Sequence, residues 1–226
     1  MKKTLPLIVI ASSIFLASQA NAKTEGNYAG IDLIKNSVQV NSHSNLASDQ
    51  ENFSEFYTHK KNDSGYGVGI NYKYAFNFDN FFIAPGVSYN LLNNEAKTGF
   101  DDGFAPYSQS MKLKSQLSFQ TNFGYDITDQ FSAYVPVGVS LFSYELNTSD
   151  NNGSGGVINN KKSGVESALF FGFGLAYEPI KNWVVNLEYN KFQSFEVTSA
   201  TATVDGGKIV AKNNVDALKV GVSYKF

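Results

Sequence analysis

Apolar residues occupy every second position along much of the chain. The clearest segment is 65–76, where tyrosine, valine, isoleucine and phenylalanine alternate with glycine, asparagine, lysine and alanine. A period of two places successive side chains on opposite faces of an extended strand. The same alternation recurs elsewhere, so eight strands are predicted, at 28–38, 65–76, 81–91, 113–125, 133–141, 169–178, 183–190 and 218–226.

The connections between these segments alternate in length. Segments 77–80, 126–130 and 179–182 are short and rich in Asn, Asp and Pro, which favour tight turns. Longer polar segments separate the other pairs, at about 39–63, 92–111, 147–164 and 197–213. Short turns at one rim and long loops at the other are typical of outer-membrane barrels. The pattern predicts an up-and-down meander with both chain ends at the short-turn rim.

Alternation alone does not say which face points inward, because soluble lipocalin-type barrels have the same period. Here the less apolar face carries Gly, Ala, Ser and Asn with Lys and Glu, which suits a narrow lumen. Aromatic residues gather at strand ends, as in the interfacial girdle of a membrane barrel. We therefore predict an all-β, closed antiparallel transmembrane β-barrel, with a girdle that includes Tyr72, Tyr74, Trp183, Tyr224 and Phe226.

The first 22 residues have the layout of a cleavable signal peptide. Lys2 and Lys3 precede an apolar run at 5–16 that is too short to span a bilayer, and Ala20-Asn21-Ala22 forms a cleavage site. We expect residues 1–22 to be removed during export through the Sec pathway. Residues 23–226 then form one barrel domain.

Composition narrows the function classes. Without the two lysines of the signal peptide, 16 of the 18 basic residues remain against 20 acidic residues, which argues against nucleic acid as a partner. The chain has no cysteine, so it forms no disulfide framework. The only histidines, His43 and His59, fall in the first predicted loop. We predict no catalytic site, no metal site and no cofactor, because catalysis needs a base and a nucleophile or paired acids held on rigid strands.

The last strand alternates up to Tyr224 and a terminal Phe226. This ending resembles the signal that bacterial outer-membrane barrels present to their assembly machinery. With the eight alternating segments, it makes the chain similar to the small eight-stranded outer-membrane barrels, the group of the OmpA barrel, OmpX, Ail and the Opa proteins. The resemblance implies a monomer in the bacterial outer membrane, in contact with lipid and, during biogenesis, with the barrel-assembly machinery.

Charged side chains on the inward face need partners in a poorly hydrated lumen. Asp32, Lys73, Glu188 and Lys219 lie at similar depths on strands that become neighbours when the barrel closes. We expect a mixed-charge network that fills the barrel and sets its register. A charged constriction in a conducting pore is the alternative, although eight strands leave little room.

The long loops carry the remaining candidate chemistry. Solvated loops rarely need aromatic residues, so the aromatics of the first two loops are candidate anchors for a partner protein. They could equally pack on the barrel rim. These residues are Phe53, Phe56, Tyr57, Phe100, Phe104 and Tyr107.

Three functions follow. The first is a surface protein that binds host or other cell-surface molecules through these loops, in adhesion or immune evasion. The second is a small porin-like pore, and the third is a structural barrel without a dedicated ligand.

Overall fold

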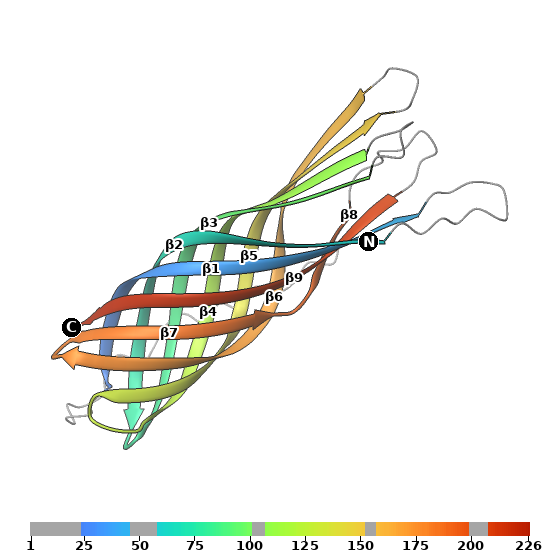
Figure 1. Cartoon of the computed structure of the whole chain (residues 1–226). Helices are drawn as coiled ribbons and strands as arrows, with labels where there is room; N and C mark the ends of the chain where they lie inside the picture. Colours follow the sequence, from blue (N-terminus) through green and yellow to red (C-terminus); the bar gives the residue numbers. More distant parts are fainter. Residues whose placement is uncertain (1–23, 46–57, 101–106, 152–156, 199–207) are drawn as a thin grey trace.

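The computed structural model describes residues 24–45, 58–100, 107–151, 157–198 and 208–226. In this part of the chain, nine strands form one antiparallel sheet (Figure 1). No helix among the described residues is long and apolar enough to cross a membrane. The strands are β1 (Gly26–Asn45), β2 (Thr58–Phe78), β3 (Phe81–Phe100), β4 (Tyr107–Asp126), β5 (Phe131–Asn151), β6 (Val157–Ile180), β7 (Trp183–Phe192), β8 (Phe195–Thr198) and β9 (Lys208–Lys225).

The sheet closes into a barrel because β1 pairs with β9 as well as with β2. β7 and β8 pair one after the other along β9, since Lys191 lies opposite Asp216 and Phe195 lies opposite Asn213. They are two parts of one interrupted strand, so the ring has eight strands in up-and-down order. The predicted fold is confirmed.

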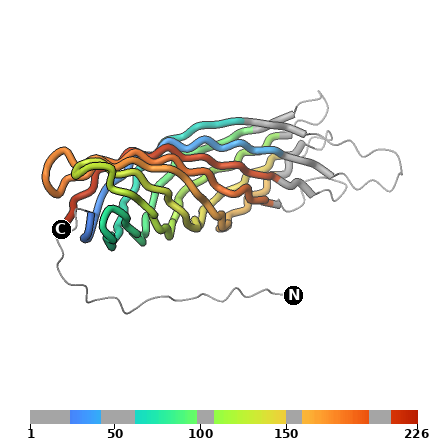
Figure 2. The backbone as a smooth tube through the Cα atoms, turned by 90° about the horizontal axis from the view of Figure 1, so that it is seen from below, coloured from blue at the N-terminus to red at the C-terminus, as the bar shows by residue number. Residues whose placement is uncertain are grey.

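The tight turns lie at one end of the barrel, which we call the turn end. Asp79 and Asn182 have φ angles of 59° and 70° in the β2–β3 and β6–β7 turns. This left-handed conformation is tolerated best by Gly, Asn and Asp, which explains the composition of these turns. The C-terminus lies at the same end (Figure 2), where the Phe226 N–H donates a 2.9 Å hydrogen bond to the Asn27 carbonyl. The opposite end, formed by the long hairpins, is the hairpin end.

The apolar face of the barrel points outward. Along β7, exposed and buried side chains alternate without interruption. Ile31, Ile70, Leu91, Phe171 and Leu187 are among the large apolar side chains that the outer wall exposes. A continuous apolar surface of this size is expected in contact with lipid and not with water. The predicted orientation of the two faces is therefore correct.

The strands are longer than a tilted membrane crossing of about 9–11 residues requires. β1 contains 20 residues and β5 contains 21. Large parts of the predicted loops are thus strand, and even the backbones of His43 and His59 are paired, opposite Thr58 and Ser42. The loops were predicted too long because the outward face becomes polar above the lipid belt. Hairpin pairing continues there without the apolar alternation.

Toward the hairpin end the barrel divides into two sheets. Pairing between β2 and β3 begins only at Tyr66 opposite Asn93, and pairing between β6 and β7 begins at Phe170 opposite Phe192. Beyond these points β3–β4–β5–β6 form one sheet and β2–β1–β9–β8 form the other, and the hairpins separate in Figure 1. An apolar core lies in this region and includes Ile34, Val38, Leu92, Met111, Leu113, Phe142, Leu146, Phe170, Phe192, Phe195, Val197 and Val215.

Because β4 contains a β-bulge, the predicted orientation of one side chain is wrong. The alternation placed Leu113 on the outer face, but its side chain is buried in the core between the two sheets. The register against β5 shifts between Leu113 and Ser115, so Lys114 is the extra residue. A bulge inserts one residue and reverses the alternation beyond it. Leu113 therefore faces inward, and Lys114 is exposed.

Candidate functional site

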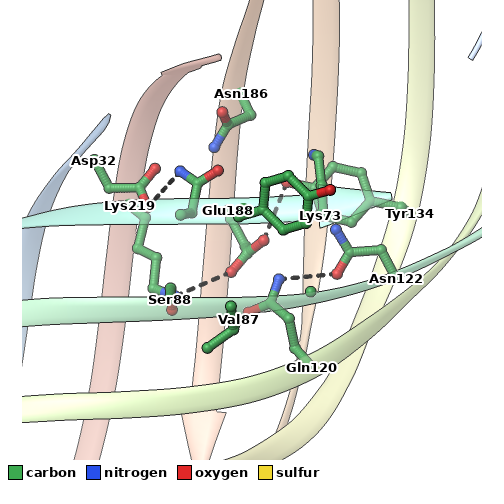
Figure 3. A pocket seen from close by; sticks show the side chains of 13 residues that line it. Asp32, Lys73, Val87, Ser88, Gln120, Asn122, Tyr134, Asn186, Glu188 and Lys219 are labelled. Carbon is green, nitrogen blue, oxygen red and sulfur yellow. Dashed lines mark hydrogen bonds and ion pairs between the residues drawn. The ribbon is translucent and has the colours of Figure 1, made fainter. Parts of the chain in front are cut away.

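Four charged residues meet inside the barrel near the middle of the lipid belt. Asp32, Lys73, Glu188 and Lys219 come from β1, β2, β7 and β9, and they point into one region of the interior (Figure 3). Glu188 lies directly opposite Lys219 on the adjacent strand, and Lys219 Nζ is 3.4 Å from Glu188 Oε1. Strand register thus brings together the four residues singled out from the sequence.

Neutral polar groups surround the two carboxylates. Asn71 Nδ2 donates to Asp32 Oδ2 at 2.9 Å. Glu188 accepts from Asn190 Nδ2 at 2.6 Å and from the Tyr134 hydroxyl at 3.1 Å. A buried carboxylate is tolerated where its oxygens are paired and hydrogen-bonded. Sequence reasoning missed these partners, although the two asparagines share the inward face of their strands with Lys73 and Glu188.

Lys73 is held differently, between two aromatic rings. Its Nζ lies 5.2 Å from the centre of the Tyr28 ring and 5.6 Å from that of Tyr134. An ammonium within about 6 Å of a ring face is attracted by the electrons of that face. Tyr134 therefore links both halves of the network, because its ring faces Lys73 and its hydroxyl binds Glu188.

The interior on the hairpin side of this network is filled in layers. Toward the hairpin end, Asn90 donates to Gln116 at 3.3 Å, and Gln116 donates to Ser140 at 3.0 Å. The apolar core between the two sheets follows, with Phe142 fully buried. A cavity of about 30 Å³ adjoins the charged residues, which is room for about one water molecule. The arrangement suits a packed interior that sets strand register better than a water-filled channel.

Most of the predicted partner-binding residues lie outside the described part of the chain, namely Phe53, Phe56, Tyr57 and Phe104. The backbones of Phe100 and Tyr107 pair with each other where β3 ends and β4 begins, while their side chains lie outside the described ones. The partner-binding role of these six residues therefore stays a prediction.

The C-terminal aromatics lie at the lipid-facing rim of the turn end. The ring of Tyr224 is 5.3 Å from that of Trp183, in an edge-to-face arrangement. Phe226 is exposed on the outer surface. This is the position of an interfacial girdle. A role for Tyr224 and Phe226 in assembly remains a prediction.

The described residues contain no group of three His, Cys, Asp or Glu side chains placed to hold a metal ion. The side chains of His43 and His59 are not among those described. The expectation that the protein is not an enzyme stays a prediction.

The chain is similar to several solved structures. Ail, the attachment invasion locus protein of Yersinia pestis, is 15% identical, with a TM-score of 0.37 over 88% of this chain and 99% of Ail. OprG from Pseudomonas aeruginosa is 14% identical, with a TM-score of 0.49 over 91% of this chain and 99% of OprG. The outer membrane protease OmpT from Escherichia coli is 12% identical, with a TM-score of 0.49 over 92% and 99%. No curated protein matches the sequence.

A closed antiparallel ring, an apolar outer belt and a filled interior define a small integral outer-membrane barrel. The sequence pattern of the family described as outer membrane protein beta-barrel domain matches residues 7–226. The chain belongs to this family. It is a bacterial outer-membrane protein embedded in lipid, and in such barrels the short turns face the periplasm and the long hairpins face the exterior.

Proposed function

We propose that this protein is a surface-exposed interaction protein, which binds host or other cell-surface molecules in adhesion or immune evasion. The observation that carries the proposal is the two-sheet extension at the hairpin end. β5 runs for 21 residues, from Phe131 to Asn151. A tilted crossing uses about 10 of them, so roughly 10 residues, or about 33 Å of strand, extend beyond the belt.

This extension has its own apolar core, which supports a role as a rigid platform. Phe142 packs against Phe192 and Phe195, with ring centres 5.1 and 5.5 Å apart. Core members such as Met111 and Leu146 lie beyond the apolar belt, where crossing a membrane does not require a core. The extension holds the outer loops away from the lipid surface, where a partner on another cell can reach them.

The filled interior argues against the porin-like alternative. Charged, amide and apolar layers occupy successive levels of the barrel. The charged layer is net neutral, with two acids and two lysines, and Lys219 and Glu188 in it form an ion pair. We assign it a structural role in closing the barrel and setting register. Assembly through the C-terminal aromatics and export through the Sec pathway complete the proposal.

To test the proposal, the protein is displayed on a Gram-negative cell that does not otherwise adhere to other cells. Attachment to cultured cells and to immobilised serum or matrix proteins is counted. Because β1 ends at Asn45 and β2 begins at Thr58, residues 46–57 can be replaced by a short Asn-Gly turn without shortening a strand, and so can 101–106. The matched control replaces 152–156, which is rich in Gly, Ser and Asn.

Attachment that disappears with loops 46–57 and 101–106, and persists in the control, is the expected result. Surface display of each variant is checked by its shift in gel mobility on heating, which reports a folded barrel. If the intact protein confers no attachment, or if the control loses it equally, the proposal is wrong and a structural role takes its place.

A further inference from the structure

A cluster of lysines lies on the outer wall just above the lipid belt. It consists of outward positions on β3, β4, β5 and β6, and we call it the lysine face. The register places Glu95 opposite Lys112, Lys112 opposite Glu145, and Glu145 opposite Ser163, so the groups form a row across four strands. Its charged members are Lys97, Lys112, Lys114, Lys161, Glu95 and Glu145.

The height of this row follows from the strand geometry. Outward apolar positions on β3 run from Phe81 to Leu91. Ten residues correspond to about 33 Å along a strand, or about 25 Å across the membrane at a tilt of ~40°, which is the usual thickness of the apolar band. Glu95 lies four positions beyond Leu91, and on β4 Lys114 lies three positions beyond Leu117. The ammonium groups are therefore at the level of the lipid headgroups.

The two carboxylates are each shared between two lysines. Lys114 and Lys161 both contact Glu145 Oε2, the latter at 2.9 Å. Glu95 lies 3.4 Å from Lys97 Nζ and 3.6 Å from Lys112 Nζ. Four ammonium groups against two carboxylates leave a surplus of two positive charges.

The arrangement also turns the positive groups outward. The side chain of Glu145 is 8% exposed, whereas those of Lys114 and Lys161 are 53% and 64% exposed. Asn147 Nδ2 donates a 3.2 Å hydrogen bond to Glu145 Oε1, which helps to keep the carboxylate against the wall. The β4 bulge places Lys114 on this face. Around Glu145, an anion that approaches the wall therefore meets the two ammonium groups before the carboxylate.

We propose that the lysine face binds the phosphate groups of phosphorylated lipids in the outer leaflet. Each ammonium group has three donors and pairs with phosphate as a point charge. A lipid is favoured over a soluble polyanion because the outward apolar residues directly below, including Leu91, Leu117 and Leu169, form a surface for its acyl chains. Clustered lysines at a membrane surface attract anionic lipid headgroups in this way.

Other parts of the wall provide a control. Lys35 on β1 and Lys191 on β7 are also exposed and lie just above the belt. Lys191 lies opposite Asp216, and Lys35 lies opposite Tyr66 and Leu218. They are separate lysines that belong to no four-strand row. The double variant K35Q/K191Q therefore removes the same charge as K114Q/K161Q and leaves the lysine face intact.

The experiment measures lipid binding to the folded full-length protein in neutral detergent by native mass spectrometry. The probes are lipid A with both phosphates, the same lipid without phosphates, and a soluble sulfated oligosaccharide. For K114Q/K161Q we expect about 25-fold weaker binding of phosphorylated lipid A, since each of the two lysines near an anionic surface contributes roughly a factor of five. K35Q/K191Q should bind like the wild type, and K114R/K161R should retain binding.

A second variant guards against the possibility that K114Q/K161Q does not fold. K114Q/K161Q/E145Q removes the carboxylate that the first variant leaves without its lysines, and it should still bind about fivefold more weakly than the wild type. Equal binding of the two forms of lipid A, or an equal loss in K35Q/K191Q, overturns the proposal. Tighter binding of the sulfated oligosaccharide than of phosphorylated lipid A also overturns it and makes the face a site for soluble polyanions.

Discussion

At the scale of single residues, the narrow interior is packed by pairing large side chains with glycines on the adjacent strand. A Cβ added at Gly174 would lie 2.2 Å from the Tyr134 ring, and one at Gly124 would lie 2.1 Å from the Phe82 ring. These contacts are too short for any side chain at either position. Tyr134 can therefore reach Glu188 and Lys73 only because residue 174 has no side chain. This explains why glycine recurs on the inward face of the strands.

The substitution Glu188→Gln tests the buried pair. It leaves the Lys219 ammonium, which is almost fully buried, without its carboxylate, and removing one partner of a buried pair costs about 3 kcal/mol. We expect the free energy of unfolding, measured by urea titration in lipid vesicles, to fall by about this amount. The double variant E188Q/K219M should recover most of the loss. A loss that is equal in the single and double variants would contradict a pairwise role.

At the scale of elements, each long strand serves two environments. Its lower half faces lipid on one side and the polar network on the other, and its upper half packs in a two-sheet structure around Phe142. The bulge at Lys114 allows β4 to serve both environments, because it reverses the alternation and directs the Leu113 side chain into the apolar core. The strands are thus continuous, while the faces they bury change along their length.

Phe142→Ala should loosen the extension and leave the membrane barrel closed. Truncating a fully buried phenylalanine typically costs about 3 kcal/mol or more. Amide exchange should therefore accelerate in residues 142–149 and stay slow in 133–139, which lie in the belt. Uniform acceleration along β5 would show that the two halves are one cooperative unit. Exchange measured by mass spectrometry after peptic digestion resolves the two segments.

The ion pairs of β5 give the extension an acid sensitivity. Hydrogen bonds from Lys114, then Lys161 and Asn147, lower the pKa of Glu145 to about 2 from its ordinary value of 4.5. A lowered pKa in the folded state stabilises the fold fully above pH 4.5, and this contribution is lost as the pH falls toward 2. Exchange protection of residues 142–149 should decline across this window in the wild type. In E145Q the decline in exchange protection should be smaller. If E145Q and the wild type show the same decline, Glu145 is not the group responsible.

At the scale of the whole molecule, we expect the interior layers to close the barrel to ions. The charged network, the amide layer and the apolar core occupy consecutive levels between the turn end and the hairpin end. Ions cross such layers only if side chains leave their packed positions, and eight strands provide a lumen just wide enough for side chains to fill. This packing is consistent with the proposal that the barrel supports its outer end.

Planar-bilayer recordings test this closure. The purified full-length protein should insert without steady single-channel conductance at moderate voltage, because Phe142 and its neighbours are packed together in the described interior. A 16-stranded porin recorded in the same membrane is the positive control. Reproducible steps that persist after refolding and scale with salt concentration would revive the porin-like alternative.

The amino-acid sequence by itself determined the strand faces, the positions of the turns and the closed eight-stranded ring. These depend on local periodicity and turn chemistry, as in 65–76 and at Asp79 and Asn182. It also singled out Asp32, Lys73, Glu188 and Lys219, because a buried charge needs a partner at its own depth.

Only the tertiary structure decided the rest. Four features depend on the register between strands. They are the contacts of Tyr134 with Lys73 and Glu188, the inward orientation of Leu113, the division into two sheets, and the row of lysines above the belt. Register is set by long-range pairing and packing. A period of two is the same for a strand facing lipid and for one in a two-sheet extension, so the pattern along one strand does not contain this information.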